Sequence, residues 1–395
     1  MNWTPETRLR WTLRWVAIGF ILGILLSWNL WTSRRVYPLF PVWDWIPMFS
    51  PGASALVAFL LLILLTWIAV KPGRWIALVF LVSTVFLALQ DQSRWQPWAY
   101  QYGLMLLPLI FLRKGQDESA ALGLLQFVVM MVYLWGGIHK CQPGWLSVWE
   151  GSMVAPLLSE SKDGFLDSLM LGFGYLVPAI EILMALGLLF RKTRLPAIVT
   201  IILTHLTILI LLGPVKGSIS NSVVWPWNIV MVGMVIVLFL KQECLVFEAF
   251  KIRSLMPVSV PLLVLMTFTP VLFYFGLWDR YLSFSLYAGQ QKRILVQVPA
   301  DALDHVPDSW RPYLMDPKAK DGHQVLLPGN WSNQELNVPL ISEWRILRAF
   351  SKILCAEDLG GAELRFYIDH RHLKGKPKQY FRCDQIEEMR PRPAK

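Results

Sequence analysis

The sequence predicts an all-α polytopic membrane bundle of about nine transmembrane helices, followed by a small C-terminal extracytoplasmic α+β domain. Of its 395 residues, 55% are hydrophobic and only 16% are charged, and the mean hydropathy is +0.46. Average soluble domains carry about 25% charged residues. The apolar residues also form runs of about 16 to 20, long enough to cross a hydrocarbon core of roughly 30 Å as helices. Together these observations exclude a soluble globular enzyme, a disordered chain and a disulfide scaffold.

Nine apolar stretches are expected to span the membrane. They are Trp15–Trp31, Ala53–Val70, Trp75–Leu89, Trp98–Leu112, Ala120–Ile138, Phe165–Phe190, Leu195–Leu212, Ser222–Leu240 and Met256–Trp278. The first follows three arginines, as in a signal peptide, but no small-residue cleavage site comes after it. It is therefore expected to be a retained first helix.

The basic residues predict the orientation of the chain. With the N-terminus in the cytoplasm, 13 Lys and Arg fall in cytoplasmic segments and six in outer loops. Such a bias in short loops is typical of membrane proteins and would make the C-terminal domain extracytoplasmic. The expected location is a bacterial inner membrane, with the lipid bilayer as partner. The net charge of +10 includes no basic stripe interleaved with aromatic residues, so no nucleic acid is expected.

The composition changes at Asp279-Arg280, which divides the chain into a transmembrane domain, residues 1–279, and a C-terminal domain, residues 280–395. The second part is rich in charged residues, Pro and Asn. In it, Arg293–Val298 and Glu363–Ile368 have the pattern of short strands, and Ile341–Cys355 has helical spacing. A stretch of this length is enough for one small folded domain.

The four cysteines predict one disulfide and no metal site. Cys355 and Cys383 both lie in the C-terminal domain, where an oxidising compartment permits a bridge. Cys244 is expected on the cytoplasmic side, and Cys141 at the outer end of the fifth span. Since the chain has no C-x-x-C motif, neither a thioredoxin-type pair nor a zinc knuckle is supported, and no metal is expected.

The strongest candidate for chemistry is Lys140, at the end of the fifth span. It follows His139, a second catalytic candidate, and lies among Tyr133, Trp135 and Trp145, which are candidate cofactor-binding residues. Partial desolvation by such aromatics disfavours the ammonium form of a lysine and can make it a base near neutral pH. Alternatively, Lys140 only extends its charge to the membrane interface.

Two further polar groups fall inside predicted spans, Glu181 in the sixth and His205 in the seventh. A charge at membrane depth costs several kcal/mol, so Glu181 must be protonated, paired or facing a cavity. Lys140 is a plausible partner for it, and a structural hydrogen bond between helices is the alternative. His205 is either a contact between helices or part of a proton relay.

The stretch that follows Asp91 contains Trp98, Tyr100 and Tyr102. Flat aromatic rings with phenol groups could line a cavity of quinone size, and we treat these three as candidate cofactor-binding residues. They could equally belong to the aromatic belt at the membrane interface.

At Tyr133–Gly151 the sequence resembles the vitamin K-dependent γ-glutamyl carboxylase family, within the wider HTTM (horizontally transferred transmembrane) domain group. The Gly136-Gly137-Ile138-His139-Lys140 stretch, with Trp145 and Gly151, matches the family's small-residue–Gly–x–x–Lys pattern followed by Trp and Gly. Lys140 matches the family's catalytic base, and His139 replaces the first lysine of its Lys-Lys pair. A second family stretch corresponds to Trp95–Gly103, with Trp98 in place of a histidine.

The resemblance implies a membrane cavity for a quinol such as vitamin K hydroquinone. In the family, the lysine deprotonates the hydroquinone, oxygenation yields a strong base, and a glutamate γ-carbon is carboxylated. The partner on the outer side would then be a protein or peptide substrate. Trp98 cannot exchange a proton as the family's histidine can, and the C-terminal domain is much shorter than the carboxylase's.

Three functions remain open from the sequence. The first is a quinol-using or carboxylase-like enzyme, a lyase, with Lys140 as base. The second is a DoxX/MauE-like redox-associated membrane protein that assists disulfide or quinone chemistry. The third is a non-catalytic membrane scaffold whose C-terminal domain binds a partner.

Overall fold

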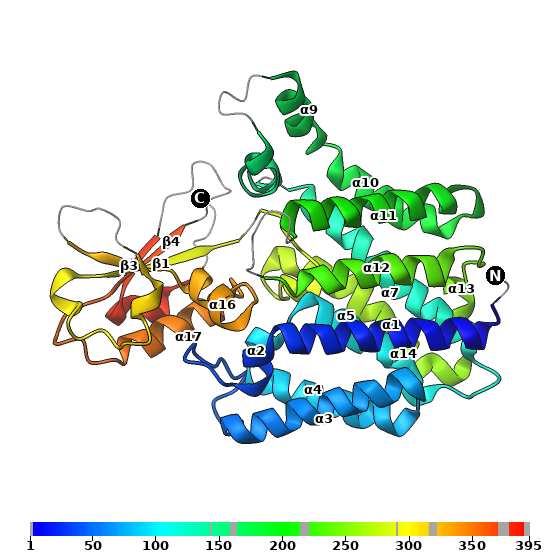
Figure 1. Cartoon of the computed structure of the whole chain (residues 1–395), viewed down its shortest axis with the longest axis horizontal. Helices are drawn as coiled ribbons and strands as arrows, with labels where there is room; N and C mark the ends of the chain where they lie inside the picture. Colours follow the sequence, from blue (N-terminus) through cyan, green and yellow to red (C-terminus); the bar gives the residue numbers. More distant parts are fainter. Residues whose placement is uncertain are drawn as a thin grey trace.

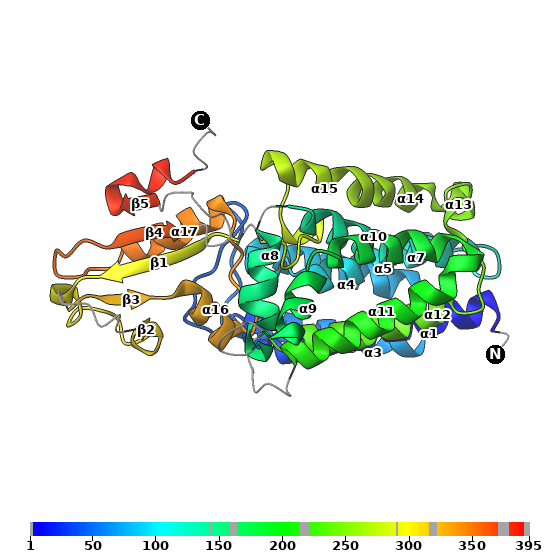
Figure 2. The same ribbon diagram turned by 90° about the horizontal axis from the view of Figure 1, so that it is seen from above.

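The protein consists of a bundle of long helices with a small sheet domain at one end. The computed structural model describes residues 3–142, 144–158, 164–213, 221–289, 291–315, 322–369 and 379–390. Figure 1 shows the long helices lying side by side along the molecule, and Figure 2 shows the same arrangement after a quarter turn. The N-terminus lies at the end of the bundle opposite the sheet domain. The expected mostly helical membrane part with a small α+β domain is present.

The helices of the bundle are α1 (Pro5–Leu26), α2 (Trp28–Thr32), α3 (Pro51–Val70), α4 (Arg74–Gln90), α5 (Pro97–Leu106), α6 (Pro108–Phe111), α7 (Glu118–Lys140), α8 (Trp145–Val148), α9 (Phe165–Phe173), α10 (Val177–Leu189), α11 (Arg191–Leu212), α12 (Val224–Phe239), α13 (Val246–Ala249), α14 (Met256–Leu263) and α15 (Thr269–Leu272). Two of the long helices begin with a capping hydroxyl followed by proline. Thr4 accepts the N–H of Thr7 at the start of α1, and Ser50 accepts that of Ala53 at the start of α3. A side-chain oxygen there satisfies an N–H that has no partner within the helix.

The expected count of nine spans is not supported by the length of the helices. Among the described residues, five helices are long and apolar enough to cross a membrane, or six if the bent pair α9 and α10 is one span. The five are α1, α3, α7, α11 and the stretch Arg253–Phe275.

The other predicted spans are short or interrupted. Helices α4 and α12 have 17 and 16 residues. The predicted span Trp98–Leu112 is broken at Leu107, because Pro108 has no N–H to continue the ladder of α5 and begins α6 instead. Helices α9 and α10 are bent by 49° at their junction. Hydropathy alone did not show these breaks.

Helix α7 is the most enclosed of the five candidate spans. In its most apolar window 83% of the residues are buried, against 22–28% for α3, α11 and Arg253–Phe275. It packs mainly on α10, and also contacts α1, α12 and α13. The exposed faces of α3 and α11 are apolar, as is typical of helices that contact a bilayer. Any residue that α7 carries on its inner faces is therefore held by neighbours on several sides.

The C-terminal domain is a five-stranded antiparallel sheet of order β2-β3-β1-β4-β5 with two helices. Its elements are β1 (Arg293–Val298), β2 (Leu314–Met315), β3 (Gln324–Leu326), α16 (Pro328–Leu336), α17 (Trp344–Cys355), β4 (Arg365–Asp369) and β5 (Gln379–Arg382). The two strands and the helix expected from the sequence are all present. Strand β1 pairs with β4 with Val296 opposite Phe366, and its alternate residues are buried.

Charged and polar side chains attach the C-terminal domain to the connections of the bundle. The Arg345 guanidinium donates to both carboxylate oxygens of Asp279, at 2.6 and 2.7 Å. Glu335 on α16 accepts the backbone N–H groups of Val36 and Tyr37. Burial raises the pKa of the Asp279 carboxyl above its ordinary value, although Arg345 opposes the shift. The two parts are therefore joined by directional contacts as well as by apolar packing.

Some basic residues used to predict the orientation are bound inside the protein. Arg35 donates to Asp91 at 2.6 Å, and both side chains are almost completely buried. Arg94 is 2% exposed and donates to the carbonyl oxygens of Leu30 and Leu87. These two arginines have structural roles beyond any topological one. Lys162 and Lys216, which also entered the count, lie outside the described residues.

Cys355 and Cys383 form the expected disulfide. Their Cα atoms are 5.8 Å apart, and the bridge joins the end of α17 to the turn that follows β5. Cys141 and Cys244 are free thiols. The bridge therefore links α17 covalently to the segment that follows β5.

Replacing Cys383 by Ser is expected to lower the free energy of unfolding of the C-terminal domain by about 3–4 kcal/mol, since the bridge closes a loop of 28 residues. Urea unfolding of the full chain in detergent, followed by tryptophan fluorescence, measures the loss. Cys244→Ser removes a free thiol and is the control, with little change expected. If both Cys355 and Cys383 react with an alkylating reagent before reduction, in protein exported to an oxidising compartment, the bridge does not form.

Candidate functional site

The candidate site lies where the C-terminal end of α7 packs against α10. The two helices approach closely at Gly137: a Cβ atom there would lie 2.7 Å from the carbonyl oxygen of Pro178. Only glycine permits this distance between the backbones, as is typical of small-residue contacts between membrane helices. The approach places the side chain of Glu181, on α10, beside the last turn of α7.

Lys140 and Glu181 form a buried ion pair. The Lys140 ammonium donates to Glu181 Oε2 at 2.7 Å and to the Gly136 carbonyl oxygen at 3.2 Å. Only 9% of the Lys140 side chain and 12% of the Glu181 side chain is exposed. The pairing expected from the sequence is therefore present, and the charge of Lys140 points into the protein rather than out to the membrane interface.

Trp145 covers the ion pair. The chain turns after α7 at Gly144, whose φ of 102° lies in the left-handed region that favours glycine. The turn brings the Trp145 ring to 5.5 Å from the Lys140 ammonium, measured to the ring centroid. The Trp145 indole N–H donates to the Gly174 carbonyl oxygen at 2.7 Å, which fixes the ring at the bend between α9 and α10. The cation thus faces a carboxylate on one side and an aromatic ring on another.

His139 belongs to a different contact. Its ring is fully buried and packs against Phe273 and Tyr274, with centroids 5.1 and 5.2 Å away. The next residue on the helix, Lys140, faces α10 instead. The structure therefore does not bring His139 into the Lys140–Glu181 pair. Trp135, also expected near the pair, donates its indole N–H to the Met266 carbonyl oxygen at 2.7 Å.

His205 lies in a hydrogen-bonded chain that links three helices. Its ring nitrogens lie 2.6 Å from Asn228 Oδ1 and 2.8 Å from the Tyr133 hydroxyl oxygen. Because the Asn228 amide N–H already donates to Val224, its oxygen faces His205 Nδ1 and accepts from it. Nε2 then accepts from Tyr133, so the arrangement is complete with a neutral imidazole. These hydrogen bonds join α7, α11 and α12. Both roles predicted for His205, a contact between helices and part of a proton relay, would use these same hydrogen bonds.

Three of the predicted cofactor-binding aromatics, Trp98, Tyr100 and Tyr102, lie in another part of the bundle. Trp98 and Tyr102 are buried against α1, where a Cβ at Gly23 would lie 2.5 Å from the Trp98 ring. Tyr100 instead packs against Phe284, with ring centroids 5.7 Å apart. These rings fill space tightly, and the structure does not bring them together with Lys140.

Sequence reasoning missed Arg280, which is 3% exposed at the junction of the two domains. Burial lowers its pKa to about 10. Its guanidinium lies 5.9 Å from the centroid of Phe273, the same ring that contacts His139. The sequence showed only a change of composition at this position, and nothing in it indicated that the charge would be buried.

Comparisons with protein-family models, with curated proteins and with solved structures give no match for this chain. In the described residues, no group of three or more His, Cys, Asp or Glu side chains could hold a metal ion. The geometry of the site is therefore the basis for any functional conclusion.

Replacing Lys140 by Met is expected to lower the free energy of unfolding by about 3–5 kcal/mol, because Glu181 is left as an unpaired buried charge. The double variant Lys140→Met/Glu181→Gln removes both charges and should recover most of the loss. Thermal unfolding in detergent measures both variants. Lys251→Met is the control: it breaks an exposed pair with Glu248, and a change below about 1 kcal/mol is expected. A single variant as stable as the wild type would show that the pair is not buried as described.

Proposed function

We propose that the chain is an integral membrane enzyme that removes a proton from a small acidic O–H compound of the quinol type, with Lys140 as base. The observation that carries the proposal is the buried Lys140–Glu181 pair, with Trp145 over the ammonium. Ionisable residues inside membrane helices are rare and mark functional sites by default. Lys140 lies on α7, the most enclosed of the candidate spans. A contact with a solely structural role at this position would not need two charged side chains.

The proposed step consists of two proton transfers. A proton moves from Lys140 Nζ to Glu181 Oε2, and the neutral amine then takes the proton of the substrate O–H. The substrate leaves this step as an anion, while the pair has gained one proton, held as an ammonium ion beside a neutral carboxyl. Electrostatic stabilisation of the new anion by that ammonium is strong where water is excluded. A quinol would supply the acidic O–H.

The resemblance of Tyr133–Gly151 to the vitamin K-dependent carboxylases supports the same role for Lys140. Carboxylation of a protein or peptide substrate on the outer side of the membrane is the most specific form of the proposal. Trp98, which stands where the family has a histidine, is buried against α1. We therefore base the proposal on proton removal by Lys140 and leave carboxylation as a second, narrower step.

A non-catalytic scaffold is the second candidate. The observation that favours it is the dense packing of Trp98 and Tyr102, which leaves those rings buried against α1 rather than lining a cofactor site. In that case the Lys140–Glu181 pair only fixes the register of α7 on α10.

The variant Lys140→Arg separates the two candidates. Arginine keeps the positive charge for Glu181 but is not deprotonated in proteins, so it can hold the pair and cannot act as a base. In aerated proteoliposomes, a reduced naphthoquinone that has lost its proton passes its electrons to dissolved oxygen. The rate of this oxidation should fall at least about 100-fold, the lower range of general base catalysis. The melting temperature should change little.

Lys251→Arg is the matched control for this experiment, since it changes an exposed paired lysine, and turnover like the wild type is expected. If Lys140→Arg retains the activity of the wild type, Lys140 is not the base. If the wild type itself oxidises no quinol, the quinol form of the proposal fails and the scaffold remains.

We also propose that the N-terminus is cytoplasmic and the C-terminal domain extracytoplasmic, in a bacterial inner membrane. The basic residues favour this orientation, and the N-terminus and the sheet domain lie at opposite ends of the bundle (Figure 1).

Single cysteines test this orientation in a background of Cys141→Ser and Cys244→Ser. Asp308 in the C-terminal domain and Gln116 before α7 are both exposed, so Asp308→Cys and Gln116→Cys are accessible positions. On intact cells, a membrane-impermeant thiol reagent should label Asp308→Cys and reach Gln116→Cys only after lysis. The opposite pattern would reverse the proposed orientation.

A further inference from the structure

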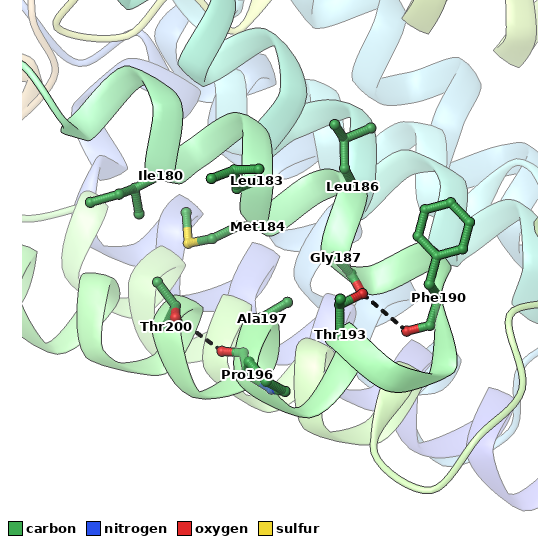
Figure 3. A pocket seen from close by; sticks show the side chains of 10 residues that line it. All are labelled: Ile180, Leu183, Met184, Leu186, Gly187, Phe190, Thr193, Pro196, Ala197 and Thr200. Atoms are coloured by element: carbon green, nitrogen blue, oxygen red, sulfur yellow. Dashed lines mark hydrogen bonds between the residues drawn. The ribbon is translucent and has the colours of Figure 1, made fainter.

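A hollow lies between α10 and α11, on the side of α10 away from α7. Its volume is about 380 Å³. Figure 3 shows Ile180, Leu183 and Leu186 on α10 along one side, with Ala197 and Thr200 on α11 along the other. Phe190, at the turn between the two helices, is at one end. We call this hollow the α10–α11 groove.

The α10–α11 groove is apolar and faces outward. Leu183, Leu186 and Phe190 are 63%, 43% and 63% exposed. The hydroxyl groups of Thr193 and Thr200 donate to carbonyl oxygens of the protein, so they offer no free donor to a ligand. Only 22% of the most apolar window of α11 is buried, which places the groove in contact with lipid. Its occupant must therefore be an apolar chain.

Two basic residues stand at the Phe190 end of the α10–α11 groove. Arg191 and Lys192 begin α11 and are exposed, and neither has an ion-pair partner in the described part of the chain. Arg194, one turn further on, is used differently: it donates to the carbonyl oxygens of Leu188 and Leu189. Cations in the first turn oppose the helix dipole, so the helix itself gains nothing from Arg191 and Lys192. They are available for an anionic group.

From these observations we infer that the α10–α11 groove binds one anionic phospholipid. One acyl chain lies along Leu183, Ala197 and Thr200, and the phosphate of the headgroup contacts Arg191 and Lys192. If a chain methylene takes roughly the 30 Å³ of a liquid water molecule, the groove has room for about a dozen carbons of one chain. Basic clusters at the cytoplasmic ends of membrane helices bind acidic headgroups in this way. The inference is independent of the proposed chemistry at Lys140.

Two sets of substitutions separate the contribution of the headgroup from that of the chain. The double variant Arg191→Gln/Lys192→Gln removes the phosphate contacts and leaves the groove. Thr200→Phe fills the groove and leaves the charges; the Thr200 hydroxyl bonds only to Pro196 of its own helix, so little else is lost. Lys71→Gln/Arg74→Gln is the matched control, since it removes two exposed cations at the start of another apolar helix, α4, away from the groove.

Native mass spectrometry of the full chain in detergent measures the binding. The wild type is titrated with phosphatidylglycerol, phosphatidylcholine or oleate, and the melting temperature of each variant confirms that it is folded. We expect one phosphatidylglycerol to bind more tightly than phosphatidylcholine or oleate. The loss of each cation should weaken that binding about fivefold, and the loss of both more than tenfold. Thr200→Phe should weaken both phospholipids, and the control pair should change neither.

Three results would overturn the inference. Equal affinity of the wild type for phosphatidylglycerol and phosphatidylcholine would show that the headgroup is not recognised. Equal affinity for oleate would show that any single chain suffices. Unchanged phosphatidylglycerol binding in folded Thr200→Phe would place the lipid elsewhere on the protein.

Discussion

The contact between Lys140 and Glu181 constrains much of the bundle. Neither charge can be buried alone without a cost of several kcal/mol, so the last turn of α7 and the second turn of α10 must lie opposite each other. Gly137 permits the distance that this requires. Once the two helices are in register, few residues separate the end of α7 from Trp145. The left-handed turn at Gly144 then brings the Trp145 ring over the pair. The position of the bend between α9 and α10 follows, because Gly174 accepts the Trp145 indole N–H.

Much of the architecture could be predicted from the sequence because it depends on local patterns. Strand Arg293–Val298 was predicted with the bounds that the structure shows, since alternation with a period of two is visible in a few residues. The partnership of Lys140 and Glu181 was predictable from cost alone, because two charges at similar depth have few other ways to be satisfied. The disulfide required only that two cysteines share one small domain.

Other features depend on distances between segments that no local pattern contains. Trp98 and Tyr102 are four residues apart and so share one face of α5, but the sequence does not say which helix that face meets. His139 and Lys140 are neighbours in the chain and yet face different helices. Counting nine spans failed for a similar reason: hydropathy adds up apolar residues across Leu107 and across the α9–α10 bend, where the backbone changes direction.

The attachment of the C-terminal domain has a consequence for biosynthesis. Glu335 accepts the backbone N–H groups of Val36 and Tyr37, and Asn337 donates to the Leu26 carbonyl oxygen. The groups at residues 26–37 therefore lack these partners until residues 335–337 have been synthesised. Until then the loop after α2 has polar groups that only water can satisfy. A ribosome-bound chain that ends before Glu335 therefore presents an incomplete surface on its first helices, one on which a chaperone could act. The helices can therefore assemble before the C-terminal domain covers that surface. The domain can cover it only after most of the polypeptide has left the ribosome.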